Sequence, residues 1–237
     1  TVITGFFGGL CYAVLAYSGF FFAPAAHGSV LMPGSLPLWT SLIAIWLLGE
    51  RLHGYRLLGL AMIVSGDALV GGSSLWHAFD GGSVWIGDLL FMCASFCWST
   101  YSVLSRRYQL QPVPATMAIT CFAFVCFVPT YLLLCAVGVL PTHLWSAPWS
   151  EVLWHALFQG VGSVVLSGIS FTVMIRAYGP VRSTMITALV PGLSALGAVV
   201  VLDEPLSWQV LLGLSLVTLG IVFGVQSPKG WALKATP

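Results

Sequence analysis

The sequence predicts an all-α membrane protein, a polytopic bundle of eight transmembrane helices. Composition, segment length and an internal repeat lead to this prediction. Hydrophobic residues make up 58% of the 237 residues, charged residues make up 6%, and the mean hydropathy is +0.98. A soluble domain carries about 25% charged residues, so this composition indicates a chain surrounded by lipid. Strong hydropathy over long windows favours helices, because the strands of a membrane barrel alternate in polarity and give a weaker signal.

Eight apolar segments are each long enough for a membrane-spanning helix, which needs roughly 20 residues. They run from Val2 to Phe22, Gly28 to Gly49, Tyr55 to Gly72, Val84 to Ser105, Ala115 to Leu140, Val152 to Ala177, Ser183 to Leu202 and Trp208 to Val225. Glycine and proline are concentrated in the short turns between them. The polar tail, residues 227–237, is expected in water.

One stretch of sequence occurs twice without a gap. The matched pairs are Pro37 and Pro191, Glu50 and Glu204, Gly59 and Gly213, and Gly66 and Gly220, and the difference is 154 in each (for example 204 − 50). Each copy comprises an apolar helix with a proline inside it, an acidic turn and a Leu-Leu-Gly-Leu helix. A repeat of this length organises the whole fold.

The basic residues fix a predicted orientation. When the eight segments alternate in direction, every arginine and lysine falls on one side, which the positive-inside rule places in the cytoplasm. These residues are Arg51, Arg56, Arg106, Arg107, Arg176, Arg182, Lys229 and Lys234. The C-terminus is then cytoplasmic. Glu50 lies at a cytoplasmic turn and Glu204 at an external turn, so the two copies are inverted relative to each other.

An inverted repeat requires an odd number of spans in each half. Residues 81–226 hold five spans, whereas residues 1–80 hold three, which match the last three of the second half. We therefore expect that the first two helices of the first repeat are missing from this sequence. They would correspond to roughly 60 to 75 further N-terminal residues in the natural chain.

Three motifs carry a resemblance to a known family. They are the turn Leu48-Gly49-Glu50-Arg51, its mate Leu202-Asp203-Glu204-Pro205, and Gly87-Asp88-Leu89-Leu90 followed by Cys97-Trp98-Ser99 and Arg106-Arg107. Together with the inverted repeat, they resemble the drug/metabolite transporter superfamily, in its EamA branch. The resemblance implies a ten-helix transporter fold of two inverted five-helix repeats with a central cavity. It also implies a carrier of small metabolites, often an exporter, in a bacterial inner membrane.

Two other classes of function compete with a transporter. A membrane-embedded enzyme would need His, Asp or Cys clustered at one depth, which the sequence does not show, so we expect no catalytic residues, no metal and no cofactor. A structural or scaffold subunit is the second alternative. No nucleotide-binding motif and no basic patch for nucleic acid are present. The expected partners are a small-molecule substrate and the lipid bilayer, and the oligomeric state, a homodimer included, stays open.

Two polar stripes are candidates for a substrate site. One comprises Ser95, Ser99 and Ser102, and the other Gln159, Ser163, Ser167 and Ser170, each along one helix face. Such stripes also arise from hydrogen bonding between helices. The predicted substrate-binding residues are Trp39, Trp98, Ser99, Tyr101, Gln159, Ser163, Ser167 and Thr187. Because no arginine or lysine is expected at mid-membrane depth, we predict a small neutral or zwitterionic substrate such as an amino acid, with a drug-like amphiphile as the alternative.

The remaining candidates are two prolines and one acid. Pro37 and Pro191 lie within spans, as static kinks or as hinges for alternating access. Asp67 lies inside its span and is a candidate for proton coupling, although its position near the external end also allows a hydrated, structural role. Glu50 and Glu204 are expected to stabilise turns and helix N-termini.

Overall fold

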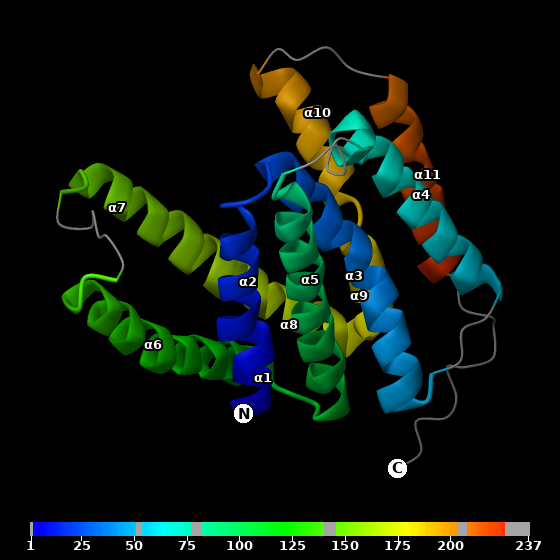
Figure 1. Ribbon diagram of the computed structural model, residues 1–237. Helices are drawn as coiled ribbons and strands as arrows, with labels where there is room; N and C mark the ends of the chain where they lie inside the picture. Colours follow the sequence, from blue (N-terminus) through cyan, green and yellow to red (C-terminus); the bar gives the residue numbers. More distant parts are fainter. Residues whose placement is uncertain (1, 51–53, 77–81, 140–145, 203–207, 226–237) are drawn as a thin grey trace.

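The computed structural model describes residues 2–50, 54–76, 82–139, 146–202 and 208–225, which contain helices and no strand (Figure 1). The N-terminal half comprises α1 (Val2–Gly5), the π-helix η1 (Phe6–Cys11), α2 (Tyr12–Gly19), α3 (Ala25–Leu48) and α4 (Gly54–Trp76). The remainder comprises α5 (Val84–Arg107), α6 (Pro112–Ala136), α7 (Trp149–His155), the π-helix η3 (Ala156–Ser167), α8 (Gly168–Tyr178), α9 (Pro180–Thr187), α10 (Val190–Leu202) and α11 (Trp208–Val225). The predicted all-α fold class is confirmed.

Each of the eight predicted segments corresponds to helical structure, but three of them depart from a regular α-helix. The first contains the π-helix η1 between α1 and α2. The sixth is α7, η3 and α8 in succession, so its middle is a π-helix, which is wider than an α-helix. The seventh divides into α9 and α10. At this break the N–H groups of Ala188 and Leu189 bond to the carbonyls of Met185 and Ile186, three residues back, at 3.2 Å each.

The contact between α4 and α11 shows how the two copies of the repeat are related. A Cβ placed on Gly59 would lie 2.5 Å from the carbonyl oxygen of Gly220, and one on Gly66 would lie 2.6 Å from that of Gly213. Gly59 therefore lies against Gly220, which is the repeat mate of Gly66. Gly66 in turn lies against Gly213, which is the repeat mate of Gly59. This reciprocal pattern is the signature of a two-fold axis between two antiparallel helices. Figure 1 shows α4 and α11 side by side and running in opposite directions.

Serine side chains join α5 to α3, the helix that carries Pro33 and Pro37. The Ser95 hydroxyl donates to the Met32 carbonyl at 2.9 Å, and the Ser99 hydroxyl donates to the Leu36 carbonyl at 3.1 Å. Both serines are fully buried. Part of the α5 stripe is therefore a seam of hydrogen bonds between two helices.

We expect replacement of both Ser95 and Ser99 by alanine to lower the stability of the protein by about 1 kcal/mol, since hydrogen bonds between membrane helices average about 0.6 kcal/mol each. The measurement is the midpoint of thermal unfolding in detergent. Thr100→Val is the matched control, because the Thr100 hydroxyl bonds within its own helix, to the Phe96 carbonyl at 2.9 Å. An unchanged midpoint in the double variant would contradict the seam.

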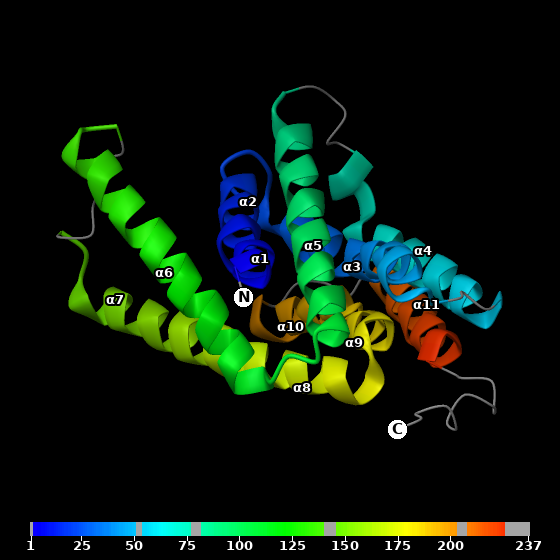
Figure 2. The ribbon, with the colours of Figure 1, turned by 90° about the horizontal axis from the view of Figure 1, so that it is seen from below.

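The α6 and α7–η3 helices extend away from the rest of the bundle (Figures 1 and 2). The N-terminal span holds α6 through two glycines, since a Cβ on Gly5 would lie 2.8 Å from Phe122 and one on Gly9 would lie 2.8 Å from Ile119. Large apolar side chains on this pair of helices are exposed, Phe124 and Leu166 among them. Such surface is stable in contact with lipid rather than water. Within the described residues, four stretches are long and apolar enough to cross a membrane: Val2–Gly19, His27–Leu48, Pro112–Ala136 and Trp149–Tyr178.

Several of the described arginines lie at the same end of the bundle. The Arg106 guanidinium donates to the Arg176 carbonyl at 2.7 Å, joining the ends of α5 and α8. Arg56 pairs with Glu50 at 3.2 Å in the neighbouring α3–α4 turn. This grouping agrees with the predicted charge pattern, and the cytoplasmic location of that end stays a prediction. Arg51, Glu204, Lys229 and Lys234 lie outside the described residues.

Candidate substrate site

An aromatic cluster lies where the N-terminal span, α5 and α8 meet. The Trp98 ring is 4.9 Å from that of Tyr12, 5.3 Å from that of Tyr101 and 5.5 Å from that of Phe171, measured between ring centroids. Tyr101 is 1% exposed, whereas Trp98 keeps part of its surface accessible. The cluster provides flat apolar ring faces between these three segments.

A glycine and a hydroxyl position this cluster. A Cβ on Gly8 would lie 2.7 Å from carbons of the Tyr101 ring, so the small residue in η1 allows the ring to pack against the backbone. The Thr172 hydroxyl donates to the Gly168 carbonyl at 2.9 Å, so the Tyr101 hydroxyl donates to Thr172, also at 2.9 Å. The tyrosine thus fixes α5 against η1 and α8 together.

The predicted site residues on α3 and α5 divide into two groups. Trp98 and Tyr101 are together in the aromatic cluster. Ser99 is bound to the Leu36 carbonyl instead, with no exposed surface. Trp39 packs edge-on against Phe96 at 5.5 Å, and its indole N–H has no acceptor among the described residues.

The predicted residues on η3 lie at the surface. Gln159, Ser163 and Ser167 are all exposed, and no hydrogen bond between described residues links them to the aromatic cluster. They are nevertheless continuous with it along the chain, because η3 leads directly into α8, which carries Phe171 and Thr172. Wide π-turns are frequent at functional sites. The polar side chains Gln159, Ser163 and Ser167 thus form a strip along η3, the η3 strip, and the chain continues from it into the aromatic cluster at Phe171 of α8.

Sequence reasoning did not identify Tyr12, Phe171 or Thr172 as parts of the cluster. Tyr12 is isolated among small and apolar residues, and Phe171 and Thr172 are adjacent, so none of them shows the regular spacing that marked the serine stripes. Their assembly depends on contacts between segments far apart in the sequence, which a pattern within one helix does not contain.

The two repeated prolines lie in different local structures. Pro37 is inside α3, which continues as an α-helix past it. Pro191 is the second residue of α10, directly after the break that follows Thr187. Thr187 is the last residue of α9, and its hydroxyl donates to the Thr184 carbonyl at 2.7 Å. The same sequence feature is therefore a continuous helix in one copy and a divided helix in the other.

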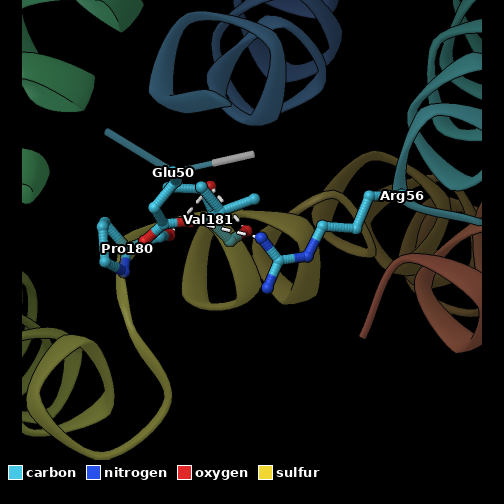
Figure 3. A network of polar contacts seen from close by, with 5 residues as sticks. Glu50, Arg56, Pro180 and Val181 are labelled. Carbon is cyan, nitrogen blue, oxygen red and sulfur yellow. Dashed lines mark hydrogen bonds and ion pairs between the residues drawn. The ribbon is translucent and has the colours of Figure 1, made fainter. Parts of the chain in front are cut away.

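The acidic turn of the first copy joins α3, α4 and α9. Gly49 ends α3 with a φ of 65°, the left-handed conformation that favours glycine at a helix C-terminus. The next residue, Glu50, pairs with Arg56 at 3.2 Å. Figure 3 shows these two residues in one polar network with Pro180 and Val181, the first residues of α9. A carboxylate at the start of a helix is stabilised by the helix dipole, which agrees with the structural role expected for Glu50.

Metal-ligating residues do not gather in the described part of the chain, where no group of three or more His, Cys, Asp or Glu is found. Such residues are in contact only as pairs among the described residues, for example the thiols of Cys11 and Cys97 at 3.5 Å. His27 pairs with Asp88 at 2.8 Å, which links the first turns of α3 and α5.

Comparison with known proteins agrees with this architecture. The chain is 26% identical over 212 residues to a probable amino-acid metabolite efflux pump of Escherichia coli (strain K12), a match that covers 86% of this chain and 69% of that protein. A solved structure described as "Crystal structure of protein" aligns with a TM-score of 0.70 at 23% identity, over 94% of this chain and 73% of that one, and it supports the fold. The EamA-like transporter family matches residues 85–225, more than half of the chain. The protein is thus a multi-pass membrane transporter rather than an enzyme, and it belongs to the EamA-like transporter family.

Proposed function

We propose that this transporter exports small neutral or zwitterionic metabolites, amino acids among them, by alternating access between its two inverted repeats. The observation that carries the proposal is the similarity, along most of the chain, to a protein described as a probable amino-acid metabolite efflux pump. Transport is secondary-active or facilitative. The site of action is a bacterial inner membrane, with the C-terminus in the cytoplasm.

The distribution of charge supports a substrate without a strong net charge. Arg56, Arg106 and Arg176 lie at helix ends, so none of them is available at mid-depth to neutralise an anionic substrate. A buried charge without a partner is costly in a membrane. A dication would need paired acids, and within the described spans Asp67 stands without a second carboxylate beside it. An amino acid presents both signs on one small head group, and the hydroxyls and the amide of η3 are suited to hydrogen-bond it.

The difference between the two repeated prolines supports alternating access. In an inverted-repeat transporter, each half adopts in turn the conformation that the other half has in the opposite state. Here the Pro37 helix is continuous and the Pro191 helix is divided. We infer that the transport cycle exchanges these two shapes, with Pro37 and Pro191 as the hinges.

The experiment that tests the function is efflux from proteoliposomes that contain the full chain. Vesicles are loaded with each of the twenty L-amino acids in radiolabelled form, one at a time, and a second panel contains aromatic cationic drugs. We expect faster release of at least one amino acid than from protein-free vesicles. Release confined to the drug panel would favour the amphiphile alternative, and no release in either panel would favour a scaffold subunit.

We expect Gln159→Leu and Ser163→Leu, tested separately, to lower the efflux rate or raise the half-saturating concentration roughly two- to tenfold, the effect of one lost hydrogen bond. Thr130→Leu is the matched control, since it introduces the same side chain at an exposed position of α6. Membrane expression and elution volume are measured for each variant. If both variants fold and transport at the parental rate and half-saturating concentration, the η3 strip does not line the path.

A further inference from the structure

Asp67 is a buried acid inside α4. It is 4% exposed, and neither carboxylate oxygen has a hydrogen-bond partner among the described residues. It follows Gly54, the start of α4, by 13 residues (67 − 54), which corresponds to roughly 20 Å along the helix. Its carboxyl group presses on α3, since a Cβ on Gly34 would lie 2.6 Å from Asp67 Oδ2. Glycine at position 34 is what allows this approach.

Among the described residues, no cation lies beside Asp67 to stabilise a charged carboxylate. α4 packs against α3, α10 and α11. Among described residues, α10 and α11 carry no titratable side chain. α3 carries His27, which is about two turns from Gly34 and pairs with Asp88 of α5. On α4 itself, Tyr55 and Arg56 lie in the first turn, three turns away. A neutral, protonated carboxyl is the form that such a site accommodates.

The segment of α3 beside Asp67 contains a backbone carbonyl that its own helix leaves without a partner. Pro37 has no N–H, so the carbonyl of Pro33, four residues earlier, has no partner in the helix ladder. Pro33 directly precedes Gly34, the residue that Asp67 contacts. The acid therefore lies against the segment of α3 that contains the hinge proline. A movement of that segment therefore changes what surrounds the carboxyl.

We propose that Asp67 is the proton-binding site of this transporter and that its contact with Gly34 couples the proton to movement of the Pro33–Pro37 segment of α3. This inference rests on the proposed transport function and specifies its energy source. In the conformation described here, the contact is closed and the proton is held. When α3 moves, water reaches the carboxyl, the proton leaves to that side, and a proton from the opposite side returns in the other half of the cycle. A metal ion is a poor occupant, because it would need several oxygen ligands.

The first experiment detects the proton without using transport. Infrared difference spectra of the full chain in lipid are recorded across a pH titration, and the carbonyl stretch of a protonated carboxylic acid is followed. We expect a band at neutral pH that is absent from Asp67→Asn and retained in Glu151→Gln. Glu151 is the control because it is an exposed acid at the start of α7. A neutral-pH spectrum without a band attributable to Asp67 would overturn the proposal.

The second experiment measures coupling in proteoliposomes, with the amino acid released fastest in the panel described above as probe. Counterflow, in which labelled substrate exchanges for unlabelled substrate, needs no pH gradient or other ion gradient. Accumulation against a concentration gradient under an imposed pH gradient needs a bound proton, and each unit of pH supports up to about tenfold accumulation at one proton per substrate. We expect the parent and Glu151→Gln to show both activities, and Asp67→Asn to keep counterflow and lose accumulation.

The outcomes separate this proposal from the proposed function. Accumulation retained by Asp67→Asn, or counterflow in the parent with no response to a pH gradient, would overturn coupling at Asp67 and leave transport intact. Accumulation that follows an imposed Na⁺ gradient instead would also overturn it. If the parent exchanges no amino acid, the transport function fails and coupling fails with it, and the infrared band alone then decides whether Asp67 binds a proton. Because asparagine has the size of a protonated aspartic acid, this variant is expected to fold beside Gly34.

Discussion

Among the substitutions that add one methyl group to α4, Gly59→Ala is expected to lower the stability of the protein most. The new Cβ would lie 2.5 Å from the carbonyl oxygen of Gly220 and 2.7 Å from the backbone nitrogen of Gly224. Both neighbours are backbone atoms, so a side-chain rotation cannot relieve the clash and α11 must move as a unit. Overpacking costs about 1–3 kcal/mol and occasionally more, and we expect the upper part of this range. The measurement is the thermal midpoint of the detergent-solubilised protein, followed by size-exclusion fluorescence.

Gly54→Ala is the matched control, because it adds the same methyl group at the first residue of the same helix, where nothing lies within 4 Å. The two-fold pattern supplies a second check. Gly220→Ala would place its Cβ 2.7 Å from the Gly59 carbonyl oxygen and should be as harmful as Gly59→Ala. A Gly59→Ala variant with the thermal midpoint of Gly54→Ala would show that α4 and α11 do not pack this closely in the membrane.

The repeat identified the glycines of this interface as equivalent positions, whereas their contact is known only from the structure. A constant offset of 154 residues identified Gly59 and Gly66 with Gly213 and Gly220, and the alternation of basic residues indicated that the copies are inverted. A two-fold axis between α4 and α11 relates the two inverted copies. It places Gly59 against the mate of Gly66 and Gly66 against the mate of Gly59. Helix existence was equally predictable, because roughly 20 consecutive apolar residues leave a bilayer-spanning chain few alternatives to a helix.

The sequence did not predict the shape of individual helices. Pro37 and Pro191 occupy equivalent positions, yet α3 is continuous and the second copy is divided into α9 and α10. The difference arises from tertiary contacts that are not repeated. Ser95 and Ser99 of α5 bond to α3 carbonyls on either side of Pro33, whereas the break between α9 and α10 is closed by bonds to residues three back. The π-helix η3 likewise leaves no periodic signature in its apolar sequence.

The candidate site was predictable in composition and less so in assembly. The pairing of Trp98 with Tyr101 follows from their spacing on one helix. The stripe that contains Ser99 was open to two interpretations, hydrogen bonding between helices or a cavity wall, and the Ser99 hydroxyl is used between helices in this conformation. Tyr12 and Phe171 could not be placed beside Trp98 from sequence, because they lie on separate segments whose packing depends on Gly8 and on the path of α8.

Tyr101→Ala is expected to be the most damaging substitution in the aromatic cluster. Removing a fully buried ring costs about 3–5 kcal/mol in a soluble protein. Lipid is as apolar as the interior, so the hydrophobic part of that cost is smaller here, and we expect the lower part of the range. The loss remains large because the ring fills the space between Gly8 and Thr172. The thermal midpoint and the yield of folded protein measure it.

Tyr101→Phe separates the ring from its hydroxyl. It keeps the packing against Gly8 and removes one hydrogen bond, so we expect a loss of about 0.5–1.5 kcal/mol. Thr172→Val removes the same bond from the α8 side and should lower the thermal midpoint by a similar amount. Both variants should export the panel's fastest amino acid with a half-saturating concentration close to that of the parent, because the ring contributes the apolar face. An effect on this concentration in Tyr101→Phe alone would mean that the hydroxyl leaves Thr172 during the cycle and binds the substrate directly.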